Sequence, residues 1–206
     1  MHVSIEEPVD GRRSQAQRRA RTRAALIESA AKAFSRCGYG NVILEEVARE
    51  AGYTRGALYH MFDGKEDLAL AVVEWVAATW EDEVWRPAQQ GTSAVAVLIA
   101  AVRGHVAFCR RDVARVMMAL RVEFDGREQP VGRAVDDVAK DLGRRFSSLI
   151  NSGRRDGVIP PGPPAKTLAV AILGALEGLA IHIAGTPYDE LIAERTVRGA
   201  LGLNAP

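Results

Sequence analysis

The residues from Ala48 to Leu68 decide the fold, and they read AREAGYTRGALYHMFDGKEDL. Apolar residues one helical turn apart predict a short helix leading into this stretch; they are Leu44, Val47, Ala48 and Ala51. Gly52 ends that helix, because glycine is the usual residue just past a helix C-terminus. Thr54 then predicts the N-cap of a second short helix, whose inner face holds Leu58 and Phe62. Two short helices joined by a tight turn that contains glycine form a helix-turn-helix.

Helical periodicity continues on both sides of this motif. Between Arg23 and Cys37 one apolar stripe predicts a helix that ends at Gly38. The stripe consists of Leu26, Ile27, Ala30, Ala31 and Phe34. A longer helix is predicted from near Lys65 to just before Pro87, because proline lacks the backbone donor that would continue it.

The remainder of the chain also has helical patterns. Five further helices are predicted, at about 93–110, 112–124, 129–152, 164–184 and 188–203, with Gly, Pro or Asp in the breaks. Prolines make the segment from Ile159 to Pro164 a stiff connector. Strand signals are weak, since no run of residues alternates polar with β-branched side chains. We therefore predict an all-α protein with an N-terminal three-helix domain and a C-terminal helical bundle.

Composition excludes several broad classes of protein. The 206 residues are 48% hydrophobic and 26% charged, which is typical of a soluble globular chain and not of disordered, collagen-like or disulfide-framed proteins. The two cysteines, Cys37 and Cys109, suit a reducing compartment. The first ten residues lack the apolar core of a signal peptide, so we expect a cytoplasmic protein.

The net charge of +1 hides a strong asymmetry. Residues 11–36 hold eight basic residues and one acidic residue, Glu28, so this stretch carries +7 and the rest of the chain −6. A basic arm of this kind binds phosphate or anionic lipid in many proteins. It can equally be a solvated tail, and charge alone does not choose between these alternatives.

The second helix of a helix-turn-helix lies in the DNA major groove, with its first residues against the base edges. Arg55 can form two hydrogen bonds to a guanine, while Gly56 allows close approach and the Ala57 methyl can touch a thymine methyl. Tyr59 and Lys65 suit phosphate oxygens. The predicted DNA-binding residues are Arg23, Thr54, Arg55, Gly56, Ala57, Tyr59, His60 and Lys65.

These segments resemble the N-terminal domain of the TetR family of bacterial repressors. The resemblance rests on LIESAA (26–31) with Phe34, Gly38-Tyr39, Val47-Ala48, Ala51-Gly52, TRGALY (54–59), Phe62 and KEDL (65–68). It covers about a quarter of the chain, and the ordered combination is more specific than a general helix-turn-helix pattern. The resemblance implies an all-α homodimer that binds operator DNA and releases it when the C-terminal domain binds a small molecule.

The chain departs from the family pattern at two places. Where relatives usually carry Thr or Ser near the start of the second helix, this chain has Val42 and Ile43, so we expect Asn41 to provide the cap. Met61 stands where relatives usually have His or Tyr, and methionine cannot donate a hydrogen bond to phosphate. Phosphate binding is therefore expected to shift towards the basic arm.

The resulting domain plan has three parts. Residues 1–20 are expected to form a flexible basic arm, residues 21–65 the helix-turn-helix domain, and residues 66–206 the domain for effector binding and dimerisation. Ligand is expected to favour a spacing of the two recognition helices that no longer matches a palindromic operator. A sequence-tolerant DNA binder without effector is the first alternative, and a cytosolic helical enzyme is the second and less supported one.

Gly174 and Gly178 lie one helical turn apart in the most apolar helix and would permit close approach of another helix. A family-type dimer interface needs such residues, and so does helix packing within one subunit. The same run is close to the length of a membrane span, but Glu177 and His182 interrupt it, so a buried helix is the better interpretation.

Candidate effector residues are apolar or aromatic with a few polar groups, as is typical of small-molecule pockets. They are Trp80, His105, Phe108, Met117, Phe124 and His182, and the same residues at helical spacing could be plain core. His105 and Cys109 could share a metal, but no companion pair has ligand spacing, so no metal is expected. No phosphate loop or nucleophile elbow is present either, and we expect neither a cofactor nor an enzyme activity.

Overall fold

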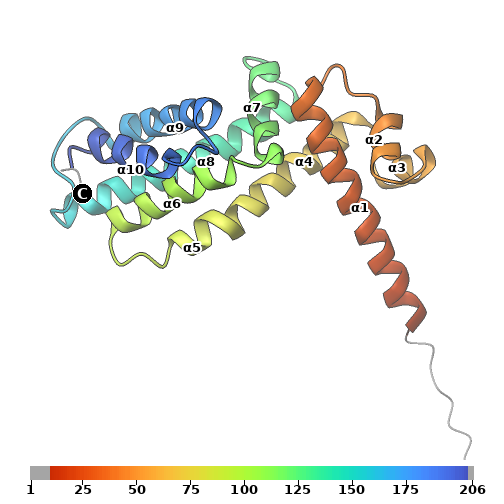
Figure 1. Cartoon of the computed structure of the whole chain (residues 1–206), viewed down its shortest axis with the longest axis horizontal. Coiled ribbons are helices and arrows are strands. Elements are labelled where there is room, and N and C mark those ends of the chain that lie inside the picture. Colours follow the sequence, from red (N-terminus) through yellow and green to blue (C-terminus); the bar gives the residue numbers. More distant parts are fainter. Residues whose placement is uncertain (1–9, 204–206) are drawn as a thin grey trace, which may run out of the picture.

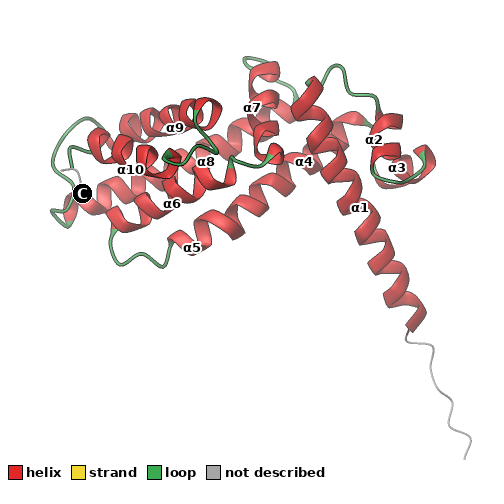
Figure 2. Cartoon of the chain, in the orientation of Figure 1, coloured by secondary structure: helices red, strands yellow, loops and turns green. Residues whose placement is uncertain are grey.

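The computed structural model of the protein describes residues 10–203, apart from the side chains of residues 10–13, 112 and 113, and this part of the chain is helical with no strand (Figure 2). The helices are α1 (Asp10–Cys37), α2 (Leu44–Glu50), α3 (Arg55–Met61), α4 (Lys65–Trp80), the π-helical turn η1 (Glu81–Trp85), α5 (Arg86–Ala88), α6 (Ala94–Phe108), α7 (Asp112–Phe124), α8 (Pro130–Arg155), α9 (Ala165–His182) and α10 (Asp189–Ala200). The all-α prediction is confirmed.

Helices α1, α2 and α3 form a small lobe at one end of the molecule, and α6, α8, α9 and α10 form the bundle at the other (Figure 1). The predicted α1 stripe is buried in the lobe, with Leu26, Ala30 and Phe34 fully inaccessible. The buried Ser29 hydroxyl donates to the Val47 carbonyl of α2 over 2.9 Å. The lobe core is thus closed by apolar packing and one satisfied polar contact.

Helix α1 begins earlier than predicted. It runs from Asp10, so residues 10–20 of the expected flexible arm are part of one helix, whereas residues 1–9 lie outside the described part of the chain. No proline and no glycine after Gly11 interrupts this stretch, so nothing in it stops a helix that the apolar stripe further along stabilises.

The turn between α2 and α3 has the geometry that its sequence predicts. Gly52 adopts φ +79°, a left-handed conformation that side-chain-bearing residues rarely adopt. The Tyr53 amide donates to the Ala48 carbonyl over 2.8 Å. Thr54 is the N-cap of α3, and its hydroxyl accepts from the Ala57 amide over 3.2 Å. The predicted glycine stop and threonine cap are confirmed.

The predicted cap of α2 is wrong. Ile43 is the N-cap residue and has no side-chain hydrogen bond, while the Asn41 side-chain amide donates to the Cys37 carbonyl over 3.0 Å. Asn41 therefore caps the end of α1 and not the start of α2. Its amide group can satisfy either kind of helix end, so its residue type alone could not decide between them.

Helix α4 leads from the lobe into the bundle and continues through η1 and α5 (Figure 1). At the π-helical turn the Arg86 amide donates to the Glu81 carbonyl, five residues back. Pro87 lies within α5, directly after the π-helical turn. The helical path therefore continues through Pro87 to Ala88, and the prediction that it ends before this proline is wrong by two residues.

An ion pair joins α6 to the start of α10. The guanidinium of Arg110 lies 2.7 Å from the carboxylate of Asp189, which is 1% exposed and also accepts the Gly185 amide. The hydrogen bond from Arg110 lowers the pKa of Asp189 to about 2, against the opposing effect of burial. This carboxylate is therefore ionised at neutral pH and fixes α10 against α6.

A glycine allows α8 to pack against the proline-containing connector that follows it. A Cβ atom at Gly153 would lie 2.6 Å from Cδ1 of the buried Ile159. The carbonyl of Gly153 also accepts the amides of Val158 and Ile159, at 2.9 and 3.0 Å. The connector therefore lies directly against the α8 backbone.

We expect Gly153→Ala to lower the free energy of unfolding by about 1–3 kcal/mol, because the added methyl group overpacks a filled site. The matched control is Gly143→Ala on the same helix, where the nearest atom to an added Cβ is 4.0 Å away. That change should raise stability by about 0.5–1 kcal/mol, the usual gain when alanine replaces glycine inside a helix. Denaturant unfolding followed by circular dichroism measures both, and equal effects would contradict the packing argument.

Candidate DNA interface and effector pocket

The predicted reading face of α3 is exposed. Arg55, Gly56, Tyr59 and His60 lie on the solvent side, while Leu58 is fully buried. Nothing but the Thr54 hydroxyl comes within 4 Å of where a Cβ would lie on Gly56, so the backbone there is open to a partner. The side chains expected to meet DNA thus share one free face of a short helix.

Arg55 is exposed but not unpartnered. Its Nε lies 2.9 Å from the Glu45 carboxylate of α2, and 67% of its side chain is accessible to solvent. Its guanidinium also lies 5.3 Å from the centre of the Tyr59 ring. These contacts hold the guanidinium at the surface beside α2 and α3, with Nε on Glu45 and no hydrogen bond from the two terminal nitrogens to a carboxylate of the described residues.

Lys65, which was predicted to contact phosphate, has hydrogen-bond partners within the protein. Its ammonium donates to the carbonyls of Tyr39 and Gly40 at 3.1 Å each, and it lies 5.3 Å from the Tyr39 ring centre. Its donors therefore stabilise the loop between α1 and α2. Arg23 remains exposed, with its guanidinium 5.3 Å from the centre of the Phe62 ring.

Glu123, near the end of α7, binds the same loop from the other side. Its carboxylate accepts the amides of Tyr39 and Gly40 over 2.6 and 2.7 Å. A Cβ on Gly38 or Gly40 would lie only 3.1 Å from a carboxylate oxygen, so both glycines make room for this contact. We call these contacts of Glu123 and Lys65 with Tyr39 and Gly40 the loop clamp.

No sequence pattern predicted the role of Glu123. The available signal was the pair of glycines at positions 38 and 40, since glycine often marks a close approach of another group to the backbone. Nothing in the sequence, however, shows that a carboxylate 83 residues away makes that approach.

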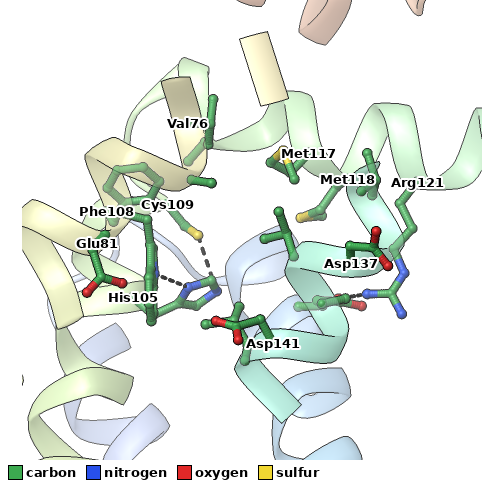
Figure 3. A pocket seen from close by; sticks show the side chains of 18 of the residues that line it. Val76, Glu81, His105, Phe108, Cys109, Met117, Met118, Arg121, Asp137 and Asp141 are labelled. Carbon is green, nitrogen blue, oxygen red and sulfur yellow. Dashed lines mark hydrogen bonds and ion pairs between the residues drawn. The ribbon is translucent and has the colours of Figure 1, made fainter. Parts of the chain in front are cut away.

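A pocket of about 340 Å³ lies among α4, α6, α7 and α8 (Figure 3). Four of the six predicted effector residues line it: Trp80, His105, Phe108 and Met117. Phe124 does not, because its ring packs against Tyr39 at the loop clamp, with 5.0 Å between ring centres. His182 does not either, because it lies exposed at the end of α9. For these two residues the geometry contradicts the prediction.

The polar groups deep in the pocket are neutral. The indole of Trp80 donates to Nδ1 of His105 over 3.1 Å, so the ring proton of the neutral histidine is on Nε2, 3.5 Å from the Cys109 sulfur. Burial lowers the pKa of His105 to about 4 and raises that of Cys109 to about 11. Among the described residues no third ligand joins them to form a metal site.

Charged residues at the rim of the pocket are joined in ion pairs. Arg145 bonds to Glu81 at 2.5 Å and to Asp141 at 2.6 Å, and its guanidinium lies 5.0 Å from the centre of the Trp85 ring. Arg121 is paired with Glu177 of α9. Asp141 and Arg145 lie one turn apart on α8, whereas the pairs of Arg145 with Glu81 and of Arg121 with Glu177 join residues far apart in sequence, which helical periodicity could not reveal.

Part of the exposed surface of α9 and α10 is apolar. Nothing lies within 4 Å of an added Cβ on Gly174 or Gly178, so these glycines do not serve helix packing within the subunit. Ile181 of α9 and Leu191 and Ile192 of α10 are 59%, 38% and 39% exposed. Although α9 is long and apolar enough to cross a membrane, one third of it is buried within the protein. We call the surface formed by these five residues the α9/α10 face.

Comparison with known proteins agrees with this architecture. The family model for bacterial regulatory proteins of the tetR family matches residues 26–72. The A-factor receptor protein of Streptomyces griseus is 26% identical over 157 residues, which are 75% of this chain but only about half, 52%, of that protein. The transcriptional repressor BepR of Brucella suis is 26% identical over 77% of this chain and 78% of its own.

Solved structures share the fold over most of the chain. A TetR transcriptional regulator from Chloroflexus aurantiacus has a TM-score of 0.77 with 22% identity, over 90% of this chain and 96% of that one. AibR, solved with isovaleryl coenzyme A and operator DNA, has a TM-score of 0.75 with 21% identity, over 89% of this chain and all of its own. Residues 26–72 thus match the DNA-binding domain of the tetR family of bacterial regulatory proteins, and the chain as a whole shares the fold of solved TetR-type regulators.

Proposed function

We propose that the protein is a homodimeric repressor that leaves a palindromic operator when a small molecule enters the pocket. One observation carries this proposal: α7 takes part in both sites. It contributes Met117 and Met118 to the pocket and Glu123 to the loop clamp. A shift of α7 on ligand binding would therefore act directly on the loop that joins α1 to α2.

The reading face of α3 supports major-groove binding. The terminal nitrogens of Arg55 would donate two hydrogen bonds to a guanine while Nε stays on Glu45, with Gly56 allowing close approach. The exposed arginines at positions 18, 19 and 21 of α1 supply charge for phosphates, which position a protein without reading sequence. Lys65 binds the carbonyls of Tyr39 and Gly40 with two of its three donors, which leaves one for a phosphate oxygen.

The α9/α10 face supports dimerisation. It offers apolar side chains around two glycines whose Cβ positions are open, which is the surface a second copy of the same helices can approach closely. A twofold dimer places its two recognition helices on half-sites about 34 Å apart, so the operator should be palindromic.

The pocket supports a small organic effector. Its volume and apolar lining are typical of such sites, and the structure of AibR with isovaleryl coenzyme A and operator DNA shows that one protein of this fold binds both kinds of partner. We assign the protein to the cytoplasm, where its DNA lies, and assign it no enzyme activity.

Release then follows from differential binding. A ligand shifts an equilibrium only by the difference in its affinity for the two states. The arrangement of α7 that the loop clamp holds would be the operator-binding state. A ligand that prefers another position of α7 would withdraw Glu123 from the loop and disfavour that state.

The DNA-reading assignment is tested by Arg55→Ala. Operators selected from a random DNA pool should bind this variant about 10- to 100-fold more weakly, and the preference for guanine at one position of each half-site should disappear. The control is Arg36→Ala, which removes an exposed, ion-paired arginine at the far end of α1. An unchanged base preference for the Arg55 variant would refute the assignment, and binding of the wild type without any preferred sequence would refute the operator model.

The role of the loop clamp is tested by Glu123→Gln, which keeps the shape of the side chain but replaces one acceptor oxygen by a donor. Because the weakened clamp disfavours the operator-binding state, operator affinity should fall by about 5-fold, and release by compounds from a thermal-shift screen should need correspondingly less compound. Glu128→Gln, an exposed acid beyond α7, is the control. Normal release from the Glu123 variant would exclude the clamp from signalling.

Dimerisation through the α9/α10 face is tested by Gly178→Glu. The wild type should have twice the chain mass of 22.3 kDa in light scattering, and the variant should shift towards one chain, because the new side chain is bulky and charged. Ala100→Glu adds the same group at an exposed position of α6 and should stay dimeric. A dimeric Gly178 variant would place the interface elsewhere.

A further inference from the structure

A second cavity adjoins the pocket. It is a groove of about 850 Å³ between α8 and α9, and Arg121, Ala139 and Glu177 line both cavities. The ion pair of Arg121 with Glu177 thus lies where the two cavities meet, and Figure 3 shows Arg121 at the edge of the pocket. A ligand that occupies both cavities must pass this pair.

The groove differs from the pocket in chemistry. Its α8 side presents polar side chains at helical spacing, namely Lys140, Arg144, Ser147, Ser148 and Asn151. Lys166 faces them from the start of α9, and apolar residues of α9, among them Val170 and Leu173, complete the wall. With Arg121 the groove holds four basic residues against two acids, Asp136 and Glu177.

Most hydrogen-bond donors of the groove have weak partners or none within the described part of the protein. Among the described residues Lys166 forms no ion pair, and the hydroxyls of Ser147 and Ser148 form no hydrogen bond within the protein. Lys140 lies 3.7 Å from an exposed Asp137, a pair of little energetic weight. Arg144 bonds to Asp141 at 2.9 Å, with 70% of its side chain exposed. The groove can therefore donate to an anion without breaking buried contacts.

The pocket has the opposite properties. Its two arginines are both paired with carboxylates, and its histidine is neutral at physiological pH. An anionic group placed there would lose its hydration without gaining a free cation, which is costly. An apolar group loses nothing on entering, so the two cavities suit the two parts of one amphipathic anion.

We propose that the effector consists of a short apolar group, which fills the pocket, joined to a phosphate-bearing head that lies in the groove against Lys140 and Lys166. This inference rests on the proposed role of the pocket as the effector site. The head crosses the border beside Arg121, whose guanidinium can exchange Glu177 for a phosphate oxygen. Gly174, at the edge of the groove and on the α9/α10 face, would place the head close to the second subunit.

The experiment compares ligands that share the apolar group but differ in the head. Butyryl coenzyme A carries phosphates, whereas the butyryl thioester of N-acetylcysteamine does not, and coenzyme A alone lacks the apolar group. S-Butyryl-4′-phosphopantetheine, with the same apolar group, tests whether a phosphate without the nucleotide of coenzyme A suffices. Binding to the full-length protein is followed by tryptophan fluorescence, because Trp80 lines the pocket.

At least one of the two phosphate-bearing amphiphiles should bind about 10-fold or more tightly than the neutral thioester, and its affinity should fall with salt. The phosphate-bearing ligand with the higher affinity shows which kind of phosphate head the groove prefers. Equal affinity for charged and neutral ligands, or no binding by either phosphate-bearing amphiphile, would overturn the proposal.

Paired variants test the groove itself. Lys140→Gln with Lys166→Gln should weaken the phosphate-bearing ligand about 10-fold or more and leave the neutral thioester within 2-fold. Arg133→Gln with Arg155→Gln removes the same charge from exposed positions of α8 outside the groove and should change neither. Equal losses in both pairs would overturn the proposal.

Operator binding is measured on the same samples. A protein that binds its operator but not the phosphate-bearing ligands would contradict only this inference, whereas loss of sequence-specific operator binding in the wild type would contradict the proposed function.

Discussion

The contact on which the arrangement of the two lobes depends is the pair of hydrogen bonds from the amides of Tyr39 and Gly40 to Glu123. Hydrogen bonds to an ionised carboxylate are stronger than those between neutral groups. This carboxylate lies near the end of the helix that also lines the pocket, so the position of α7 and the conformation of the loop are fixed together. The ammonium of Lys65, bound to the carbonyls of the same two residues, completes the clamp.

The loop clamp explains why glycine and tyrosine occur at positions 38 to 40 of the loop between α1 and α2. Gly38 and Gly40 leave space for the carboxylate, and Tyr39 fills the gap between Phe34 of the lobe and Phe124 of α7 with ring contacts at 5.6 and 5.0 Å. Phe124 therefore belongs to the junction between the lobes and not to the effector pocket. In the proposed mechanism this junction is the element that responds to ligand.

How much the sequence could predict depends on the range of the interactions. The α1 stripe, the Gly52 turn and the Thr54 cap involve residues within a few positions of one another, and all three were predictable. Helix ends in the bundle lie within a few residues of the predicted positions for the same reason.

Residues whose partners are distant in sequence were not predictable. The sequence around Lys65 does not indicate that its ammonium binds backbone carbonyls 25 and 26 residues away. The pocket was predictable in composition, because aromatic and sulfur side chains on helices favour such sites. Its boundary was not, because whether Phe124 or His182 reaches it depends on how the helices pack.

The pairing of Arg55 with Glu45 has a consequence for specificity. An exposed ion pair contributes about 0–1 kcal/mol, whereas a bidentate contact of arginine with guanine discriminates by about 1–3 kcal/mol. In the proposed complex the two terminal nitrogens of Arg55 can meet a guanine while Nε stays on Glu45. Glu45 then orients the guanidinium at little cost, and an oriented pair of donors favours a base with two acceptors over a base with one.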